Sequence, residues 1–166
     1  SALRVFEAWG VPTVNPSATV ATCDDKVLMS LAFATAGVPA LRTAVAFTVE
    51  SALEVGERLG YPLIVKPVTG SWGRLLARAN SPADLRAILE QKKALGGPQH
   101  GVFYLQEYVV KPGRDLRVFY VGGEVIAASY RNSAHWITNV ARGAVSTTCP
   151  ITDEIVAVTR LAARAV

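Results

Sequence analysis

The chain has few of the residues that build metal centres or disulfide frameworks. Its 166 residues include two cysteines, two histidines and one methionine. Cys23 and Cys149 lie far apart without metal-ligand spacing, so we expect reduced thiols in a cytoplasmic setting. His100 and His135 are isolated as well, which argues against a metal held by cysteine and histidine.

Long hydrophobic runs are also missing. No apolar stretch approaches the roughly 18 residues of a membrane span, and no secretory signal precedes the first expected element. The composition, 51% hydrophobic and 18% charged, is typical of a folded globular protein. The net charge of +4 is small and spread along the chain. It allows an anionic ligand or an acidic partner, and it does not indicate nucleic acid.

The most informative stretch is residues 60–74. Residues 63–65 form a short apolar run that predicts a buried strand, and Lys66 follows directly before Pro67, which cannot extend a central strand. The loop Gly70-Ser71-Trp72-Gly73 comes next. One fixed cation beside a loop rich in backbone N–H groups suits a polyphosphate. The stretch is not a P-loop, because the lysine precedes the glycines. A surface hairpin with a solvated lysine fits equally well.

Periodicity and capping signals predict a mixed α/β (α+β) fold. A small α/β layer comes first, and an antiparallel sheet follows it. The expected strands are 11–14, 43–47, 63–65, 75–79, 102–110, 116–121 and 125–130. The expected helices are 1–10, 26–36, 48–59, 81–95 and one from Thr152 to the end of the chain, with one or two helical turns at 17–22. The expected N-caps are Asp24 or Asp25, Thr48 and Thr152, and Gly122-Gly123 is the expected hairpin turn. Residues 131–149 are expected to form a long polar loop, and such loops in compact domains are usually functional or disordered. Because Trp136 and Ile137 argue against disorder, we favour function.

Several polar residues occupy positions that are unfavourable or unusual for them. Gln106 and Glu107 interrupt an apolar strand and need partners, and they could read the edge of a base. Lys26 lies in the first turn of a helix, where the dipole disfavours a cation but where anions bind. An ordinary exposed lysine explains Lys26 as well. Near the ends of predicted strands, Asp115, Arg117 and Arg131, each taken singly, are also consistent with solvated surface charges.

In this order, the pieces resemble the ATP-grasp carboxylate–amine ligases, and among them the RimK-like branch. The resemblance covers nearly all of the chain. It runs through Asn15-Pro16, Asp25-Lys26, Val65-Lys66-Pro67, the loop at 70–73, Gln106-Glu107-Tyr108-Val109 and the string at 113–119. The strings at 70–74 and 136–143 are most similar to the ligases of carrier-protein-dependent lysine biosynthesis. The resemblance implies an ATP-grasp fold, in which two small subdomains grip ATP between two sheets.

The resemblance also implies roles at the matching positions. Lys26 and Lys66 would hold the ATP phosphates, under a loop made of Gly70, Ser71, Trp72, Gly73 and Arg74. The adenosine would lie against Gln106, Glu107, Tyr108, Val109 and Asp115. The catalytic cations would be Arg117, Arg131 and Arg142. The acceptor amino acid would lie near His135, Trp136, Thr138 and Asn139. Phosphoryl transfer depends mainly on positioning and charge neutralisation, so these residue types fit the implied chemistry.

The implied activity is ATP-dependent ligation of 2-aminoadipate to the C-terminal glutamate of an acidic amino-group carrier protein, through an acyl phosphate. A RimK-like or glutamate-specific ligase is the alternative within the branch. Outside it, a non-catalytic nucleotide-binding module or a structural domain stays open. The resemblance leaves the oligomeric state open, a homo-oligomer included, and implies no nucleic acid and no membrane.

The resemblance divides the chain into residues 1–18 as a remnant of an amino-terminal domain, 19–107 as the small ATP-grasp subdomain and 108–166 as the start of the large one. The Mg²⁺ ligands of the family would lie beyond residue 166. We therefore expect a chain truncated at both ends and inactive by itself. Asp153 and Glu154 are better explained by the dipole of the last helix than as metal ligands.

Overall fold

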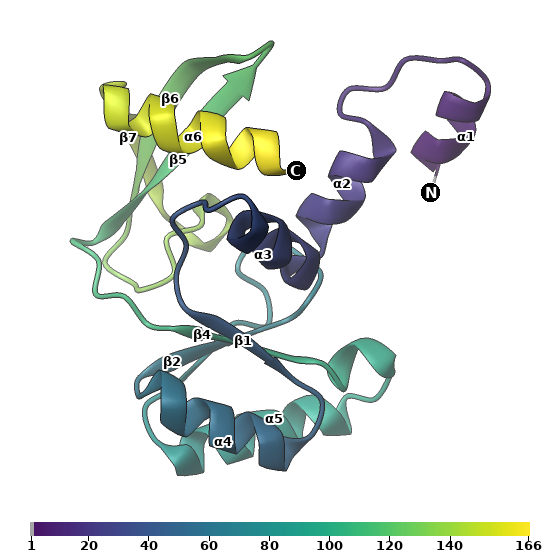
Figure 1. The fold of residues 1–166 in the computed structure, drawn as a ribbon. Helices are drawn as coiled ribbons and strands as arrows, with labels where there is room; N and C mark the ends of the chain where they lie inside the picture. Colours follow the sequence, from purple (N-terminus) through teal and green to yellow (C-terminus); the bar gives the residue numbers. More distant parts are fainter. Residues whose placement is uncertain (1) are drawn as a thin grey trace.

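The computed structural model describes residues 2–166, apart from the side chain of Gln99. Two helices, α1 (Ala2–Ala8) and α2 (Ser17–Asp24), project from the rest of the molecule (Figure 1). The expected strand at 11–14 is wrong, because this segment has no regular structure. The carboxylate of Glu7 instead accepts hydrogen bonds from the hydroxyl of Thr13 and from the backbone and side chain of Ser17. These bonds tie the turn between the two helices together.

A four-stranded antiparallel sheet forms the first half of the structure. Its strands are β1 (Thr43–Ala46), β2 (Leu63–Lys66), β3 (Ala77–Ala79) and β4 (Phe103–Glu107), in the order β1-β4-β2-β3. The strands expected at 75–79 and 102–110 are therefore shorter than predicted. For β3 the reason is visible in the backbone, since Leu75 has a positive φ of 54°, which a strand cannot contain.

Two helices, α4 (Val49–Leu59) and α5 (Pro82–Ala94), cover one face of this sheet (Figure 1). The capping prediction for Thr48 is confirmed: its hydroxyl accepts a hydrogen bond from the backbone N–H of Ser51, in a reciprocal capping box. Alternate strand residues meet apolar side chains of both helices in one core. Its fully buried members include Leu63, Val65, Leu85, Leu89, Phe103 and Leu105.

The second half of the structure is a three-stranded antiparallel sheet. β5 (Arg114–Val121) and β6 (Glu124–Asn132) are joined by the expected Gly122-Gly123 turn, and β7 (Val145–Thr148) pairs with β6. The prediction of a continuous loop over 131–149 missed β7 and the short helix η2 (Val140–Arg142). A further short helix, η1 (Pro98–His100), precedes β4.

Helix α6 (Asp153–Ala165) packs on β5 and β6 of the second sheet, and α3 (Lys26–Thr35) lies beside it and contacts the projecting α2 (Figure 1). Both predicted N-caps are confirmed. The Asp25 carboxylate accepts from the N–H groups of Val27 and Leu28, and the Thr152 hydroxyl accepts from that of Ile155. Within residues 2–166, no helix has the length and apolar character to cross a membrane.

Replacing a leucine with alanine should lower the free energy of unfolding much more at a buried position than at an exposed one. Leu89→Ala should lower the free energy of unfolding by about 2–5 kcal/mol, because Leu89 is fully buried and the cavity left behind cannot collapse completely. Leu31→Ala on α3, where the side chain is 63% exposed, is the matched control and should cost less than about 1 kcal/mol. Urea denaturation measures both. Equal losses for the two variants would contradict the assigned core.

Candidate functional site

A pocket with a volume of about 300 Å³ lies where the two sheets meet. Its walls come from β2, the end of β4, β5, β6 and the segment after β6. Ten of the residues singled out in the sequence line it: Lys66, Gln106, Glu107, Tyr108, Val109, Asp115, Arg131, Trp136, Thr138 and Asn139. The other five lining residues were not assigned a site role from the sequence: Leu41, Ile64, Leu76, Lys111 and Ile137. The pocket therefore has apolar walls with a few convergent charged and polar groups, as small-molecule sites have.

Strand alternation explains which residues reach this pocket. On β2, Leu63 and Val65 enter the core, whereas Ile64 and Lys66 face the pocket. The register places Ile64 opposite Gln106 of β4, and both line the pocket. The next residue of β4, Glu107, points its carboxylate at Arg42 instead. That carboxylate accepts from the backbone N–H and from Nε of Arg42, each at 2.8 Å.

Lys66 is the most perturbed cation of the pocket. Its Nζ donates to Oε1 of Gln106, so the half-buried Gln106 has the partner that the sequence required. Burial, followed by repulsion from Lys26 and Lys111, lowers the pKa of Lys66 to about 8. Among residues 2–166 none of these three lysines forms an ion pair with a carboxylate. Three neighbouring lysines without such a counterion suit a polyanionic ligand.

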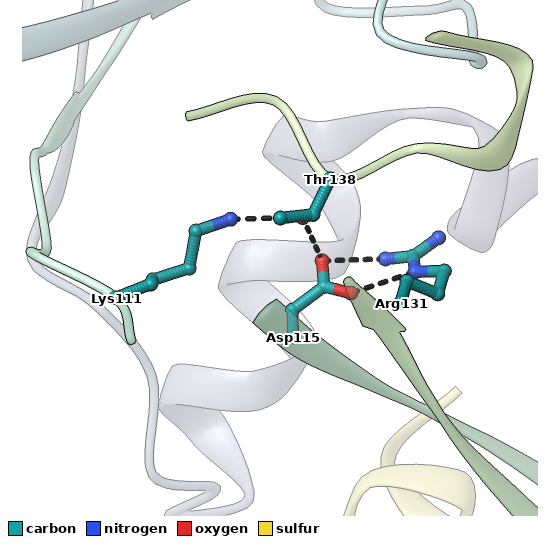
Figure 2. Close-up of polar contacts among 4 residues, drawn as sticks. All are labelled: Lys111, Asp115, Arg131 and Thr138. Carbon is teal, nitrogen blue, oxygen red and sulfur yellow. Dashed lines mark hydrogen bonds and ion pairs between the residues drawn. The ribbon is translucent and has the colours of Figure 1, made fainter. Parts of the chain in front are cut away.

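A second polar group of the pocket centres on Asp115 (Figure 2). Arg131 donates to both carboxylate oxygens of Asp115 at 2.7 Å, and the hydroxyl of Thr138 donates to one of them. Lys111 in turn donates to Thr138 at 2.8 Å. Burial raises the pKa of Asp115, but the hydrogen bonds from Arg131 and Thr138 outweigh it and hold the pKa below its ordinary value. Asp115 is therefore a carboxylate with fixed orientation.

Lys26 holds the glycine-rich loop from the N-terminus of α3. Its Nζ donates to the carbonyl oxygen of Gly70 at 2.8 Å, and its backbone N–H donates to that of Val68 at 2.9 Å. Trp72 has a positive φ of 62° and stacks under the guanidinium of Arg74, whose Cζ lies 4.6 Å from the ring centroid. The loop, in which Ser71 is exposed, is thus anchored to Lys26 at Val68 and Gly70.

The same loop touches the segment that carries Asn139 and Arg142. Gly73 is buried, and a Cβ on it would lie 2.9 Å from Cγ2 of Ile137 and 3.1 Å from Oδ1 of Asn139. The same Cβ would lie 3.4 Å from Cγ of Arg142. The structure therefore brings the glycine loop of the first half against the 137–142 segment of the second half, although the sequence separates them by more than 60 residues.

Besides Lys26, Arg142 and the loop at 70–74, two further predicted residues, Arg117 and His135, lie outside the main pocket. Arg117 is exposed on β5, two positions from Asp115 and on the same face of the sheet, and its guanidinium packs over the ring of Phe119 at 5.3 Å. His135 lines a neighbouring cavity of about 440 Å³ together with Arg78, Tyr108 and Trp136. Its Nδ1 accepts the backbone N–H of Ile137.

The residues present do not fit a magnesium ion. Within residues 2–166 no cluster of three or more His, Cys, Asp or Glu side chains could hold a metal. The two carboxylates that line the pocket, Glu107 and Asp115, are paired with Arg42 and Arg131. Hard cations require several oxygen ligands, and these oxygens are already occupied. The cations and apolar walls of the pocket are features that suit a nucleoside polyphosphate.

Comparison with known proteins identifies the family. A model of the RimK-like ATP-grasp domain matches residues 23–166. The chain belongs to this family. The ATP-grasp fold expected from the sequence is thereby confirmed. Solved structures agree with it: the RimK domain ATP-grasp protein from Sphaerobacter thermophilus superimposes with a TM-score of 0.77 at 21% identity, covering 96% of this chain and 56% of that one.

The curated relatives are ligases. The alpha-aminoadipate–LysW ligase LysX of Saccharolobus solfataricus is 36% identical over 91% of this chain and 55% of its own length. The glutamate–LysW ligase ArgX of Sulfolobus acidocaldarius is 35% identical over 86% of this chain and 51% of its own length. The chain thus spans about half the length of the relatives it matches. A D-alanine–D-alanine ligase from Bacillus anthracis in complex with ATP has the same fold, with a TM-score of 0.74 at 14% identity over 99% of this chain and 54% of that one.

The perturbed lysine predicts a pH dependence. Raising the pH from 7 to 9 should weaken ATP binding up to about tenfold, because the Lys66 ammonium is present below its pKa of about 8 and is lost above it. Calorimetric titration at pH 7, 8 and 9 measures this. Lys66→Gln is the control, since it should bind ATP more weakly and without this pH step. A wild-type affinity that stays constant from pH 7 to 9 would contradict a phosphate contact by the Lys66 ammonium.

Proposed function

We propose that the full-length protein is an ATP-dependent ligase that joins 2-aminoadipate to the C-terminal glutamate of an acidic carrier protein of the LysW type. The bond would form through an acyl phosphate, as a step of lysine biosynthesis in the cytoplasm. The observation that carries the proposal is the pocket between the sheets, where Lys66, Lys111 and Arg131 converge beside apolar walls. The relatives named LysX, 33–38% identical over 91% of the chain, support the choice of substrates.

The proposed division of labour follows the geometry. Lys66 and Lys26 would hold the phosphates under the loop at 70–74, with the adenosine against residues 106–109 and the fixed carboxylate of Asp115. Lys111, which the sequence did not suggest, would add a third cation beside Lys66. The pocket end formed by Trp136, Thr138 and Asn139, with the neighbouring His135, would receive the acceptor amino acid.

The proposed catalytic arginines differ in their exposure and in whether a carboxylate already pairs with them. Arg142 is exposed beside Gly73 and could reach a ligand held under the loop. Arg117 is exposed on the open face of β5. Arg131 is paired with Asp115, so it would act on the reacting group only by exchanging this partner, and otherwise it would orient Asp115. Such cations stabilise the charge that develops in phosphoryl transfer.

A second candidate is a ligase with glutamate as acceptor. ArgX of Sulfolobus acidocaldarius and the tetrahydromethanopterin:alpha-L-glutamate ligase of Methanosarcina acetivorans match this chain at 35% and 33% identity. Glutamate and 2-aminoadipate differ by one methylene, which in an apolar pocket is worth about 1–3 kcal/mol of discrimination. The two acceptors therefore need a direct competition experiment.

That experiment uses the full-length protein, ATP, Mg²⁺ and a LysW-type carrier, with both amino acids present at equal concentration. We expect mass spectrometry to show a carrier enlarged by 2-aminoadipate at least about tenfold faster than by glutamate. The initial rate at low carrier concentration should fall as salt rises, because an acidic partner is steered by charge. Preferred transfer of glutamate would support the second candidate, and no transfer of either amino acid would contradict both.

Two substitutions separate binding from chemistry. Lys66→Ala should weaken ATP binding roughly tenfold to a hundredfold, because one charge-assisted phosphate contact is worth about 1.5–3 kcal/mol. Arg142→Ala should leave ATP affinity unchanged and lower the single-turnover rate, because a cation near developing charge acts mainly in the transition state. Arg160→Ala on α6 is the control and should change neither quantity. Normal ATP binding by Lys66→Ala, or normal turnover by Arg142→Ala, would refute the corresponding role.

A further inference from the structure

Helix α5 buries a lysine on its core-facing side. Leu85, Leu89 and Lys92 recur at i, i+4 and i+7, so that all three point toward the sheet. Lys92 is only 7% exposed. Lysine is almost never this buried unless it is paired, because removing an ammonium from water is expensive. The position therefore requires either a partner for the ammonium or a function for it.

The structure provides Lys92 with little compensation. Its Nζ lies 3.4 Å from the carbonyl oxygen of Val102 and 6.0 Å from the ring centroid of Phe103. Across residues 2–166, the ion pairs are those of Arg42 with Glu107 and Arg131 with Asp115, so no carboxylate pairs with Lys92. An ammonium has three donors, and here one long hydrogen bond uses one of them. Burial correspondingly lowers the pKa of Lys92.

A cavity of about 190 Å³ adjoins this lysine. Apart from Lys92 and Gln91, its lining is aliphatic: Val65, Leu75, Leu76, Ala77, Ile88 and Leu95. No acidic side chain lines it. This volume suits a small ligand of about six to eight non-hydrogen atoms. Leu95 and Gln91 are exposed, so the cavity is open to solvent on that side.

We propose that this cavity is a binding site for a small aliphatic carboxylate. The carboxylate accepts hydrogen bonds from Lys92 and from the amide of Gln91, and the alkyl chain packs against the leucine and isoleucine side chains. The positive charge selects an acid over the corresponding amide or alcohol. The aliphatic walls select an alkyl acid over a strongly hydrated inorganic anion, which would lose its water without compensation. The site lies on the core face of the sheet and is separate from the proposed ligase function.

The position of the cavity couples it to the nucleotide pocket. Leu76 lines both cavities, and Val65 directly precedes Lys66. Leu75, with its positive φ of 54°, connects the glycine loop to β3 and stands at the cavity wall. An acid bound beside Lys92 therefore contacts the exit of the loop and the strand that carries Lys66. Its binding should change the affinity for ATP.

The test is a titration of the protein with hexanoate, followed by NMR of ¹³C-labelled leucine and isoleucine methyl groups. We expect saturable shifts for Leu75, Leu76, Ile88 and Leu95, and at least tenfold weaker binding of the uncharged analogue hexanamide. Lys92→Met, which keeps the length of the side chain and removes its charge, should weaken hexanoate binding at least tenfold. Lys93→Met, at the exposed neighbouring position, is the matched control and should bind hexanoate within twofold of wild type.

Several outcomes would overturn the proposal. These are the absence of a saturable shift in the wild type, equal binding of hexanoate and hexanamide, or unchanged hexanoate binding by Lys92→Met. The melting temperature of each variant confirms that it is folded before titration. Calorimetric titration of ATP with and without saturating hexanoate then measures the coupling, for which we expect at least a twofold change in the Kd. An unchanged Kd would overturn the coupling between the two sites. None of these readouts depends on ligase turnover.

Discussion

The register between β2 and β4 determines which side chains face the pocket and which enter the core. A shift of one residue would move Lys66 into the apolar layer between the sheet and its helices, and would move Val65 into the pocket. The register is fixed because the side chains of Leu63, Val65 and Leu105 are almost completely buried in the core. The hydrophobic effect on one face of the sheet thus positions the ammonium on the other face, and Gln106 meets it there as a neutral partner.

The charges of the candidate site are divided in a consistent way. Its carboxylates, Glu107 and Asp115, are each held by an arginine, whereas its lysines repel one another. A pocket arranged in this way is a region of net positive potential, because its negative charges are already neutralised and its positive charges are not. Such an arrangement is unfavourable for the empty protein, and an anionic ligand relieves it. The repulsion between these lysines lowers the folding stability of the empty protein, which is typical of binding sites.

Much of this arrangement can be predicted from the sequence, and the exceptions have physical reasons. Local signals were sufficient for the caps at Asp25, Thr48 and Thr152, and for the hairpin at Gly122-Gly123. The sequence also showed that Gln106 needs a hydrogen-bond partner, but it did not identify Lys66 as that partner. The strand β7 was missed because Val145–Thr148 alternates weakly and depends on pairing with β6. Lys111 looked like part of a turn, and only the folded chain places it beside Thr138. The pairing of Glu107 with Arg42 likewise depends on contacts over 65 residues.

The close approach at Gly73 has a consequence for how the two halves can change. Because residue 73 is a glycine, its backbone packs directly against the side chains of Ile137 and Asn139. The two halves therefore approach each other as closely as a bare backbone allows. A larger residue at 73 would act as a spacer that props the halves apart, and a smaller one does not exist. A shorter side chain at 137 would not be enough, because Asn139 is also close and the positive φ of 68° at Gly73 strains any side chain there. Position 73 should therefore stay glycine whatever residue occupies position 137.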